Sequence, residues 1–160
     1  MLRTGTGFDS HRFEGAGKLV LGGVTIEGST GLKGHSDADV LSHAVIDALM
    51  GAAAQGDIGG RFPDSGDKWK GVSSIEMLKI TVDEMAGKGF QVVNVDTTVI
   101  AERPKLTPWI DKIRKSLGET LSVDVSRISV KAKTAESMGA LGRGEGMAAM
   151  AAVLVEETEK

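Results

Sequence analysis

The chain has 160 residues, 41% of them hydrophobic and 26% charged, and a net charge of −3 from 19 Lys and Arg against 22 Asp and Glu. This weak acidity argues against a surface built for generic nucleic-acid or membrane binding. The lack of cysteine excludes disulfide scaffolds, thiolate zinc sites and thiol catalysis. No stretch approaches the ~18 apolar residues that span a bilayer, so we expect one soluble domain over residues 1–160.

The first predicted elements are a strand, a hairpin and a helix. Residues 3–8 form the expected strand, and residues 18–26 the hairpin, with Gly22-Gly23 as its turn. Ser36 is a favourable helix N-cap. Apolar residues then recur at helical spacing over 40–52, which predicts an amphipathic helix.

Two more helices follow along the chain. A capping box over 73–76 opens the second helix, which ends near Gly87. Thr107 as N-cap, with Pro108 in the first turn, opens the third.

Three later segments are predicted as strands: 91–101, 128–133 and 147–155. The last of them is a nearly continuous run of small apolar residues, which is typical of a strand buried on both faces. We therefore expect an α+β fold, a single-domain two-layer sandwich. One mostly four-stranded sheet plus a small hairpin would be covered by about three helices on one face.

Acidic residues accompany the histidines. Asp9 and His11 are two residues apart at a strand end, so both side chains lie on one face. His43 is mid-helix, on a polar stripe shared with Asp39 and Asp47. A catalytic zinc takes three N/O ligands and keeps one position open, which Asp9, His11 and His43 would satisfy, with Asp47 orienting the imidazole of His43. The alternative is a polar strand end and a solvated helix histidine.

Glycine-rich segments suggest places where backbone approaches an anion. Residues 35–37 precede a helix, 56–64 form a turn-dense loop with two carboxylates, and 142–146 carry Arg143 between glycines. None is a Walker or Rossmann fingerprint. Each segment, taken alone, is equally typical of a turn that needs positive φ.

Taken together, six short motifs resemble the 2-C-methyl-D-erythritol 2,4-cyclodiphosphate synthase family, in family order and over nearly the whole chain. These are Gly7-Phe8-Asp9-Ser10-His11, Gly34-His35-Ser36-Asp37-Ala38-Asp39, Gly56-Asp57-Ile58-Gly59, Phe62-Pro63-Asp64, Arg103-Pro104-Lys105 and Gly142-Arg143-Gly144-Glu145-Gly146.

The resemblance implies a metal-dependent lyase of the non-mevalonate isoprenoid pathway. It would convert 4-diphosphocytidyl-2-C-methyl-D-erythritol 2-phosphate to the 2,4-cyclodiphosphate and release CMP. Zn²⁺, or another divalent transition metal, would be held by Asp9, His11 and His43, and Mg²⁺ or Mn²⁺ by Glu136. Chemistry of this kind depends on aligning two phosphates and neutralising their charge.

The resemblance also implies roles for individual residues. His35 and Thr134 would be catalytic and stabilise the transition state. Substrate contacts are implied for a larger set: Asp9, His11, His35, Ser36, Asp57, Gly59, Phe62, Asp64, Ser65, Ala101, Pro104, Lys105, Leu106, Lys133, Thr134, Glu136 and Arg143. Ala140 and Met150 depart from the family pattern, where Phe and Glu are common, so the implied cavity on the three-fold axis loses its aromatic wall.

The implied assembly is a homotrimer with active sites between subunits, in the cytoplasm or, after removal of a transit peptide, in a plastid stroma. Its partner would be the small cytidine-diphosphate substrate, with no nucleic acid and no membrane. Two other functions use the same residues. A zinc-dependent phosphohydrolase would release free phosphate, and a metal- or nucleotide-binding module would keep the metal as a structural element.

Overall fold

A computed structural model describes residues 1–63, 65 and 67–158. Its strands are β1 (Leu2–Leu21), β2 (Val24–Leu32), β3 (Phe90–Ile100), β4 (Ile128–Lys133) and β5 (Gly146–Glu157). Its α-helices are α1 (Val40–Ala52), α2 (Ile58–Arg61), α3 (Ser74–Gly87), α4 (Ile110–Leu121) and α5 (Gly139–Gly142). Short 3-10 turns are η1 (Asp67–Trp69), η2 (Thr107–Trp109) and η3 (Val125–Arg127).

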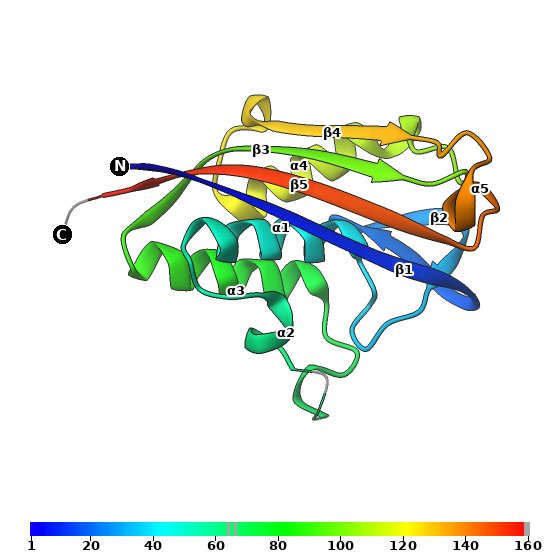
Figure 1. Ribbon diagram of the computed structural model, residues 1–160, viewed down its shortest axis with the longest axis horizontal. Helices are drawn as coiled ribbons and strands as arrows, with labels where there is room; N and C mark the ends of the chain where they lie inside the picture. Colours follow the sequence, from blue (N-terminus) through cyan, green and yellow to red (C-terminus); the bar gives the residue numbers. More distant parts are fainter. Residues whose placement is uncertain (64, 66, 159–160) are drawn as a thin grey trace.

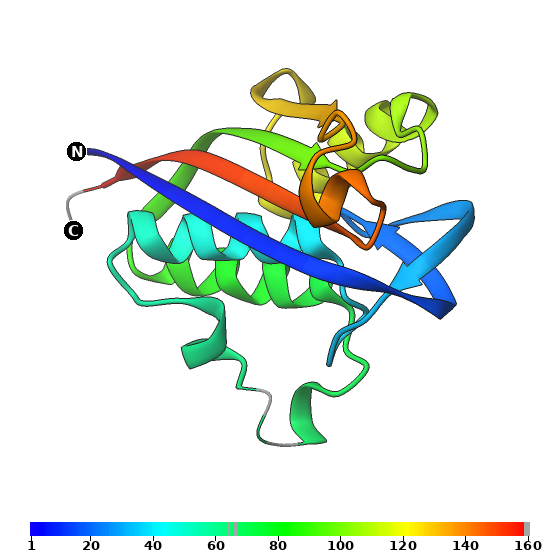
Figure 2. The same cartoon turned by 45° about the vertical axis from the view of Figure 1, so that its right-hand side comes forward.

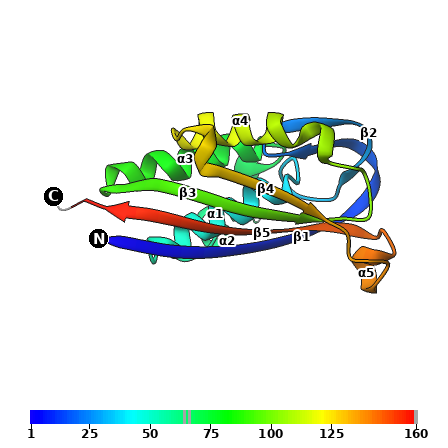
Figure 3. The same ribbon diagram turned by 90° about the horizontal axis from the view of Figure 1, so that it is seen from above.

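The strands form one sheet in the order β2-β1-β5-β3-β4, with β3 and β4 parallel and the other neighbours antiparallel (Figure 1). The three long helices, α1, α3 and α4, lie on one side of this sheet, as the view from above shows (Figure 3). The expected two-layer α+β architecture is therefore confirmed. Within the described part of the chain, no helix is both long and apolar enough to span a bilayer.

The first strand is much longer than predicted. The expected strand at 3–8 and the first arm of the hairpin at 18–21 are parts of β1, which runs without a break because it pairs with β5 as far as Arg12 and with β2 from Phe13. The hairpin thus extends the sheet to five strands. Its turn at Gly22-Gly23 is confirmed, with φ of 56° and 75°, the left-handed region that glycine adopts at low cost.

The hairpin curls out of the sheet (Figure 2) toward the side that carries the helices, whereas α5 lies on the other side (Figure 3). The backbone N–H of Phe13 donates to the carbonyl of Glu145 at 3.0 Å. This contact joins the middle of β1 to the segment that leads into β5.

The helix α1 has the predicted bounds but a different cap. Asp39, and not Ser36, is its N-cap, and its carboxylate accepts the N–H of Ser42 at 3.0 Å. The same carboxylate accepts the N–H groups of Gly22 and Gly23 at 2.9 and 2.8 Å and the hydroxyl of Ser42. Asp39 is fully buried, and burial raises its pKa against the lowering effect of these hydrogen bonds. One side chain therefore fixes both the helix start and the hairpin turn.

The other two predicted helix starts also need correction. Ser73 is the N-cap of α3, but its side chain makes no capping hydrogen bond, and the carboxylate of Asp37 accepts the N–H of Ser74 at 3.1 Å instead. Thr107 is not a cap, since it is the first residue of η2, which follows Leu106 and leads into α4. At α3, a side chain from a distant segment thus replaces the local cap that the sequence suggests.

A candidate metal centre and its pocket

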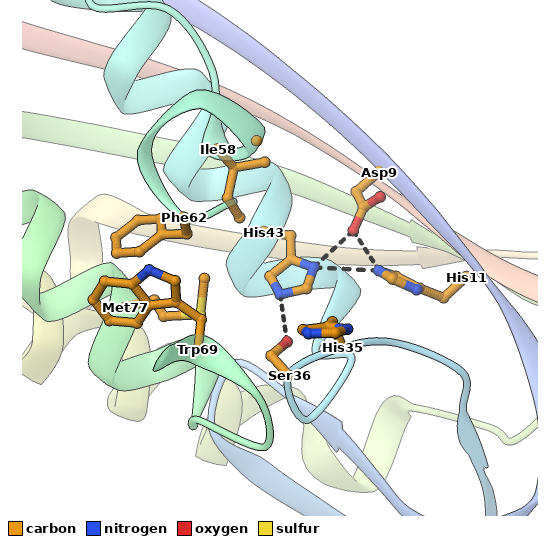
Figure 4. Close-up of a pocket in the computed structure, with 10 residues that line it drawn as sticks. Asp9, His11, His35, Ser36, His43, Ile58, Phe62, Trp69 and Met77 are labelled. Carbon is orange, nitrogen blue, oxygen red and sulfur yellow. Dashed lines mark hydrogen bonds and ion pairs between the residues drawn. The ribbon is translucent and has the colours of Figure 1, made fainter. Parts of the chain in front are cut away.

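Three ligating side chains from β1 and α1 meet at one point (Figure 4). Asp9 and His11 lie on the same face of β1, and His43 projects from α1 toward them. The Oδ2 atom of Asp9 is 2.8 Å from Nε2 of His11 and 2.9 Å from Nδ1 of His43. The two imidazole nitrogens are 3.2 Å apart. The sequence prediction that these three residues converge is confirmed.

This arrangement fits a divalent transition metal. Tetrahedral zinc with ligand bonds of about 2.0–2.1 Å holds its ligand atoms roughly 3.3 Å apart, close to the separations found here. One carboxylate and two imidazoles form the N/O donor set that zinc accepts, and a three-ligand set leaves a further position open.

Hydrogen bonds on the far side of each imidazole decide which nitrogen faces the cluster. The Nδ1–H of His11 donates to the carbonyl of Lys33 at 2.6 Å, which leaves its Nε2 lone pair for the cluster. For His43, Nε2 is the outer nitrogen, 2.8 Å from the hydroxyl of Ser74 and 3.1 Å from that of Ser36. The Nδ1 atom of His43 is thereby directed at Asp9 and His11.

The cluster is electrostatically coupled. Burial disfavours the charged form of Asp9, but hydrogen bonds and charge from His11 and His43 outweigh it and hold the Asp9 pKa well below its usual range. Burial also disfavours the charged form of His11, but its hydrogen bond to Asp9, the charge of Asp9 and the Lys33 carbonyl raise the His11 pKa. Asp9 is therefore favoured as an ionised ligand, and a metal would compete with a proton for Nε2 of His11.

The cluster forms one wall of a cavity of about 170 Å³. His35 and Ser36 lie beside it on the loop before α1, and Gly59 and Phe62 face it from α2 and the residue that follows. These four predicted substrate contacts are thus brought together with the metal ligands.

The opposite wall is apolar and was largely missed by sequence reasoning. Ile58, Trp69 and Met77 line it together with Phe62, whose ring packs edge-on against Trp69 at 4.8 Å between centroids (Figure 4). A tryptophan in an otherwise polar loop was the available signal. Met77 and Ile58 gave none, because apolar residues on short helical segments are usually core.

Three acidic residues near the cavity have structural contacts. The helical spacing predicted that Asp47 orients the imidazole of His43, and this is wrong. The carboxylate of Asp47 instead accepts the N–H of Ile58 at 2.7 Å. Nor does Asp39 share a polar stripe with His43, since it is fully buried against the hairpin turn. Asp57 caps α2 by accepting the N–H of Gly60 at 2.8 Å. Asp47 and Asp57 therefore hold in place the short helix that forms the cavity rim.

A second group of predicted site residues lies beyond the carboxyl ends of β3 and β4. The Thr134 hydroxyl donates to the Glu136 carboxylate. Glu102, which sequence reasoning missed, accepts the N–H groups of Ala135 and Ser137 at 2.9 and 3.2 Å and so fixes this turn. Glu136 and Ser137 have left-handed backbone, with φ of 50° and 63°.

Neighbouring residues of this second group have varied surroundings. Ala101 and Leu106 are buried, whereas Lys105 and Lys133 are exposed. Pro104 lines a separate cavity with Arg103 and Gly144, and Arg143 is exposed and donates to Glu145 at 2.7 Å.

The structure does not bring the two groups into one pocket within the described chain. β1 and β4 are three strand spacings apart in the sheet, about 14 Å. Ser65 is exposed beyond the metal cavity, and Asp64 lies outside the described residues.

The sequence matches the YgbB family model over residues 2–156. A relative from Solibacter usitatus (strain Ellin6076), named 2-C-methyl-D-erythritol 2,4-cyclodiphosphate synthase, is 51% identical over 156 residues, 98% of each chain. The fold is similar to the bifunctional IspDF from Campylobacter jejuni, with a TM-score of 0.95 and 42% identity over 99% of this chain, which spans 43% of that longer chain. A Plasmodium falciparum structure described as an IspF–CDP complex gives a TM-score of 0.86 and 32% identity, over 99% of this chain and 97% of the other. This chain, with its Asp-His-His cluster, belongs to the YgbB family, that of the 2-C-methyl-D-erythritol 2,4-cyclodiphosphate synthases.

Proposed function

We propose that this protein converts 4-diphosphocytidyl-2-C-methyl-D-erythritol 2-phosphate to 2-C-methyl-D-erythritol 2,4-cyclodiphosphate and CMP. The observation that carries the proposal is the cluster of Asp9, His11 and His43 in a cavity shared with His35 and Ser36. The named relatives, about half identical over the whole chain, supply the substrate.

The reaction needs no protein nucleophile. An oxygen of the substrate's 2-phosphate attacks the β-phosphorus, a new P–O bond closes the ring, and the bond from the β-phosphorus to the bridging oxygen breaks, so that CMP leaves with the electron pair. Two anionic groups must be held in line while negative charge develops on the leaving group. The protein's task is therefore to position phosphates and neutralise charge, which suits a chain without cysteine.

Asp9, His11 and His43 would hold Zn²⁺ or a similar divalent metal, and Glu136 would be the main protein ligand of Mg²⁺ or Mn²⁺. Such cations supply Lewis-acid stabilisation of the phosphate charges. The donor chemistry agrees with this division, because imidazoles suit zinc whereas magnesium takes one or two carboxylates and keeps several waters.

His35 and Thr134 would contact the reacting phosphates and stabilise the transition state. His35 is exposed at the cavity mouth, where its ring can donate to a phosphate oxygen. Thr134 is exposed beside Glu136, and the bonds from Glu102 hold this turn in one conformation.

The active protein would be a homotrimer with each site shared between neighbouring subunits. Two observations support this. The metal cavity and the Thr134–Glu136 turn occupy different parts of one chain, so a second copy is needed to unite them. Phe8 and Met150 are register partners on the sheet face opposite α1, and they are 58% and 51% exposed, which favours a protein contact there.

The reaction can be tested by ³¹P NMR of the protein with the proposed substrate and Mg²⁺, before and after zinc removal. CMP that forms in step with two coupled cyclic-diphosphate signals, and only with zinc, is the expected result. Orthophosphate in place of the cyclic product would indicate a hydrolase. Unchanged substrate with folded, metal-loaded protein would indicate a binding module.

The assembly can be tested by sedimentation equilibrium at micromolar protein. A trimer mass is expected for the unmodified chain, and a smaller mass for Met150→Lys. Val125→Lys is the matched control, because Val125 is also an exposed apolar residue (42%) but lies on η3. A monomer mass for the unmodified chain would contradict the shared site.

A further inference from the structure

His43 has a chain of polar side chains behind it. Its Nε2 atom is 2.8 Å from Oγ of Ser74, which in turn is hydrogen-bonded to Oδ1 of Asp37. The other carboxylate oxygen of Asp37 accepts the backbone N–H of Ser74 at 3.1 Å. Ser74 is fully buried in the first turn of α3, and Asp37 lies on the loop before α1. A carboxylate, a hydroxyl and an imidazole are thus linked in sequence.

The chemistry of these groups fixes the direction of each hydrogen bond. An ionised carboxylate only accepts, so the single hydroxyl proton of Ser74 is donated to Asp37. The Ser74 oxygen is then left with lone pairs alone, and it accepts the Nε2–H of His43. Ser74 therefore favours the neutral tautomer of His43 that carries its proton on Nε2 and its lone pair on Nδ1. The carboxylate of Asp9, 2.9 Å from Nδ1, favours the opposite tautomer while no metal is bound, so the two contacts compete for the single ring proton.

Ser36 is a weaker candidate for the same task. Its hydroxyl is 3.1 Å from Nε2 of His43 and 3.1 Å from that of Ser74, so it can rotate between partners. It is only half-buried, on the loop that also carries His35. Ser74, by contrast, is held through both its hydroxyl and its backbone N–H by one carboxylate. His43 therefore keeps an acceptor when Ser36 turns toward a ligand.

We propose that Asp37 and Ser74 are positioning residues that act through His43: together they hold its ring orientation and favour the Nε2–H tautomer, which leaves Nδ1 free to bind a divalent metal beside Asp9 and His11. The proposal rests on the metal-binding role of this cluster. Partners of this kind behind a ligating histidine are expected to contribute 10–100-fold to metal affinity, roughly.

The test measures metal binding and the tautomer, and does not rely on turnover. Zn²⁺ affinity is obtained by competition with a chromophoric chelator, for the unmodified protein and for Ser74→Ala, Asp37→Asn, Ser36→Ala and His43→Ala. The tautomer of His43 in the metal-free protein above the histidine pKa is read from long-range ¹H–¹⁵N NMR correlations. Thermal unfolding monitors the fold of each variant.

We expect Ser74→Ala to weaken Zn²⁺ binding about 10–100-fold and to shift metal-free His43 toward the Nδ1–H tautomer, because Asp9 then faces the ring without the competing acceptor. Ser36→Ala should change both the affinity and the tautomer by much less. Asp37→Asn should act differently. If the amide oxygen keeps the Ser74 N–H, the NH₂ group faces the hydroxyl and donates to it. Ser74 then donates to Nε2 and shifts His43 toward the Nδ1–H form, in which Nδ1, the atom that faces the cluster, has no lone pair for a metal.

Unchanged affinity and an unchanged Nε2–H tautomer in Ser74→Ala would overturn the proposal, and so would equal losses in Ser36→Ala and Ser74→Ala. Wild-type affinity in His43→Ala would overturn the metal site itself, and with it both this inference and the zinc role in the proposed function. A loss of Zn²⁺ affinity in His43→Ala without a loss in Ser74→Ala would overturn only the positioning role of Asp37 and Ser74. The NMR readout decides the case even where a variant is less stable.

Discussion

A Cβ atom on Gly7 would lie 2.0 Å from the carbonyl oxygen of Ala44. At this point β1 and α1 are therefore in backbone contact. Asp9 follows Gly7 by two residues on the strand, and His43 directly precedes Ala44 on the helix. Glycine at position 7 thus permits the close approach that brings Asp9 and His43 within 2.9 Å.

The first prediction follows from this contact. Gly7→Ala should lower the free energy of unfolding by about 1–3 kcal/mol, because the methyl group forces α1 away from the strand. Zn²⁺ affinity should fall as well. Gly87→Ala is the control, since a Cβ there meets no atom within 4 Å, and it should be neutral or stabilising by up to about 1 kcal/mol. Urea unfolding measures the stability of both variants, and equal stabilities would contradict the close contact at Gly7.

Removal of one ligand should abolish the metal site. His43→Ala is expected to weaken Zn²⁺ binding by more than about 100-fold, because loss of a direct ligand exceeds the cost of losing an outer partner. His35→Ala should bind Zn²⁺ like the unmodified protein, since His35 lines the same cavity without belonging to the ligand cluster. Isothermal titration calorimetry distinguishes the two, and similar losses in both variants would refute the assigned ligand set.

Asp39 should be important for stability. Asp39→Ala leaves the buried N–H groups of Gly22 and Ser42, and the partly buried one of Gly23, without their acceptor, so we expect a loss of about 3 kcal/mol or more in chemical unfolding. The matched control is Asp124→Ala. Asp124 caps η3 through the N–H of Ser126 but is exposed, so water can replace it and the loss should be much smaller than for Asp39. A similar cost for both would mean that Asp39 acts only as a helix cap.

One ion pair should give a pH-dependent stability. The hydrogen bond from Arg61 lowers the pKa of Glu84, and the charges of Arg61 and Lys88 lower it further. Burial raises this pKa only slightly. A carboxyl group whose pKa is lower in the folded state stabilises the protein at pH values above its unfolded pKa of 4.5. This contribution is lost as the pH falls through the pKa of the folded state.

The unfolding free energy of the unmodified protein should therefore exceed that of Glu84→Gln by less than about 1 kcal/mol near neutral pH, and the difference should vanish in acid. Glu119→Gln, an exposed site on α4, controls for the loss of one surface charge. A difference that grows as the pH falls would contradict a lowered Glu84 pKa in the folded protein.

Local patterns predicted much of the chain correctly. The bounds of α1 follow from apolar residues at helical spacing, and the hairpin turn follows from two glycines that adopt positive φ. The shared face of Asp9 and His11 follows from the two-residue period of a strand. The helix caps were less predictable, since Ser36 and Thr107 suit an N-cap by residue type, yet neither caps a helix here.

The sequence by itself determined the elements whose geometry depends on neighbouring residues, and with them the two ligands on β1 and the helix that carries the third. Only the tertiary structure decided which partners these groups meet. Ser74 is hydrogen-bonded to His43, 31 residues away in the sequence. Asp39 accepts N–H groups of the hairpin turn and does not share a polar stripe with His43. Trp69 and Met77 line the cavity. Such contacts depend on how strands and helices pack, and buried polar groups take whichever acceptor the packing brings within reach.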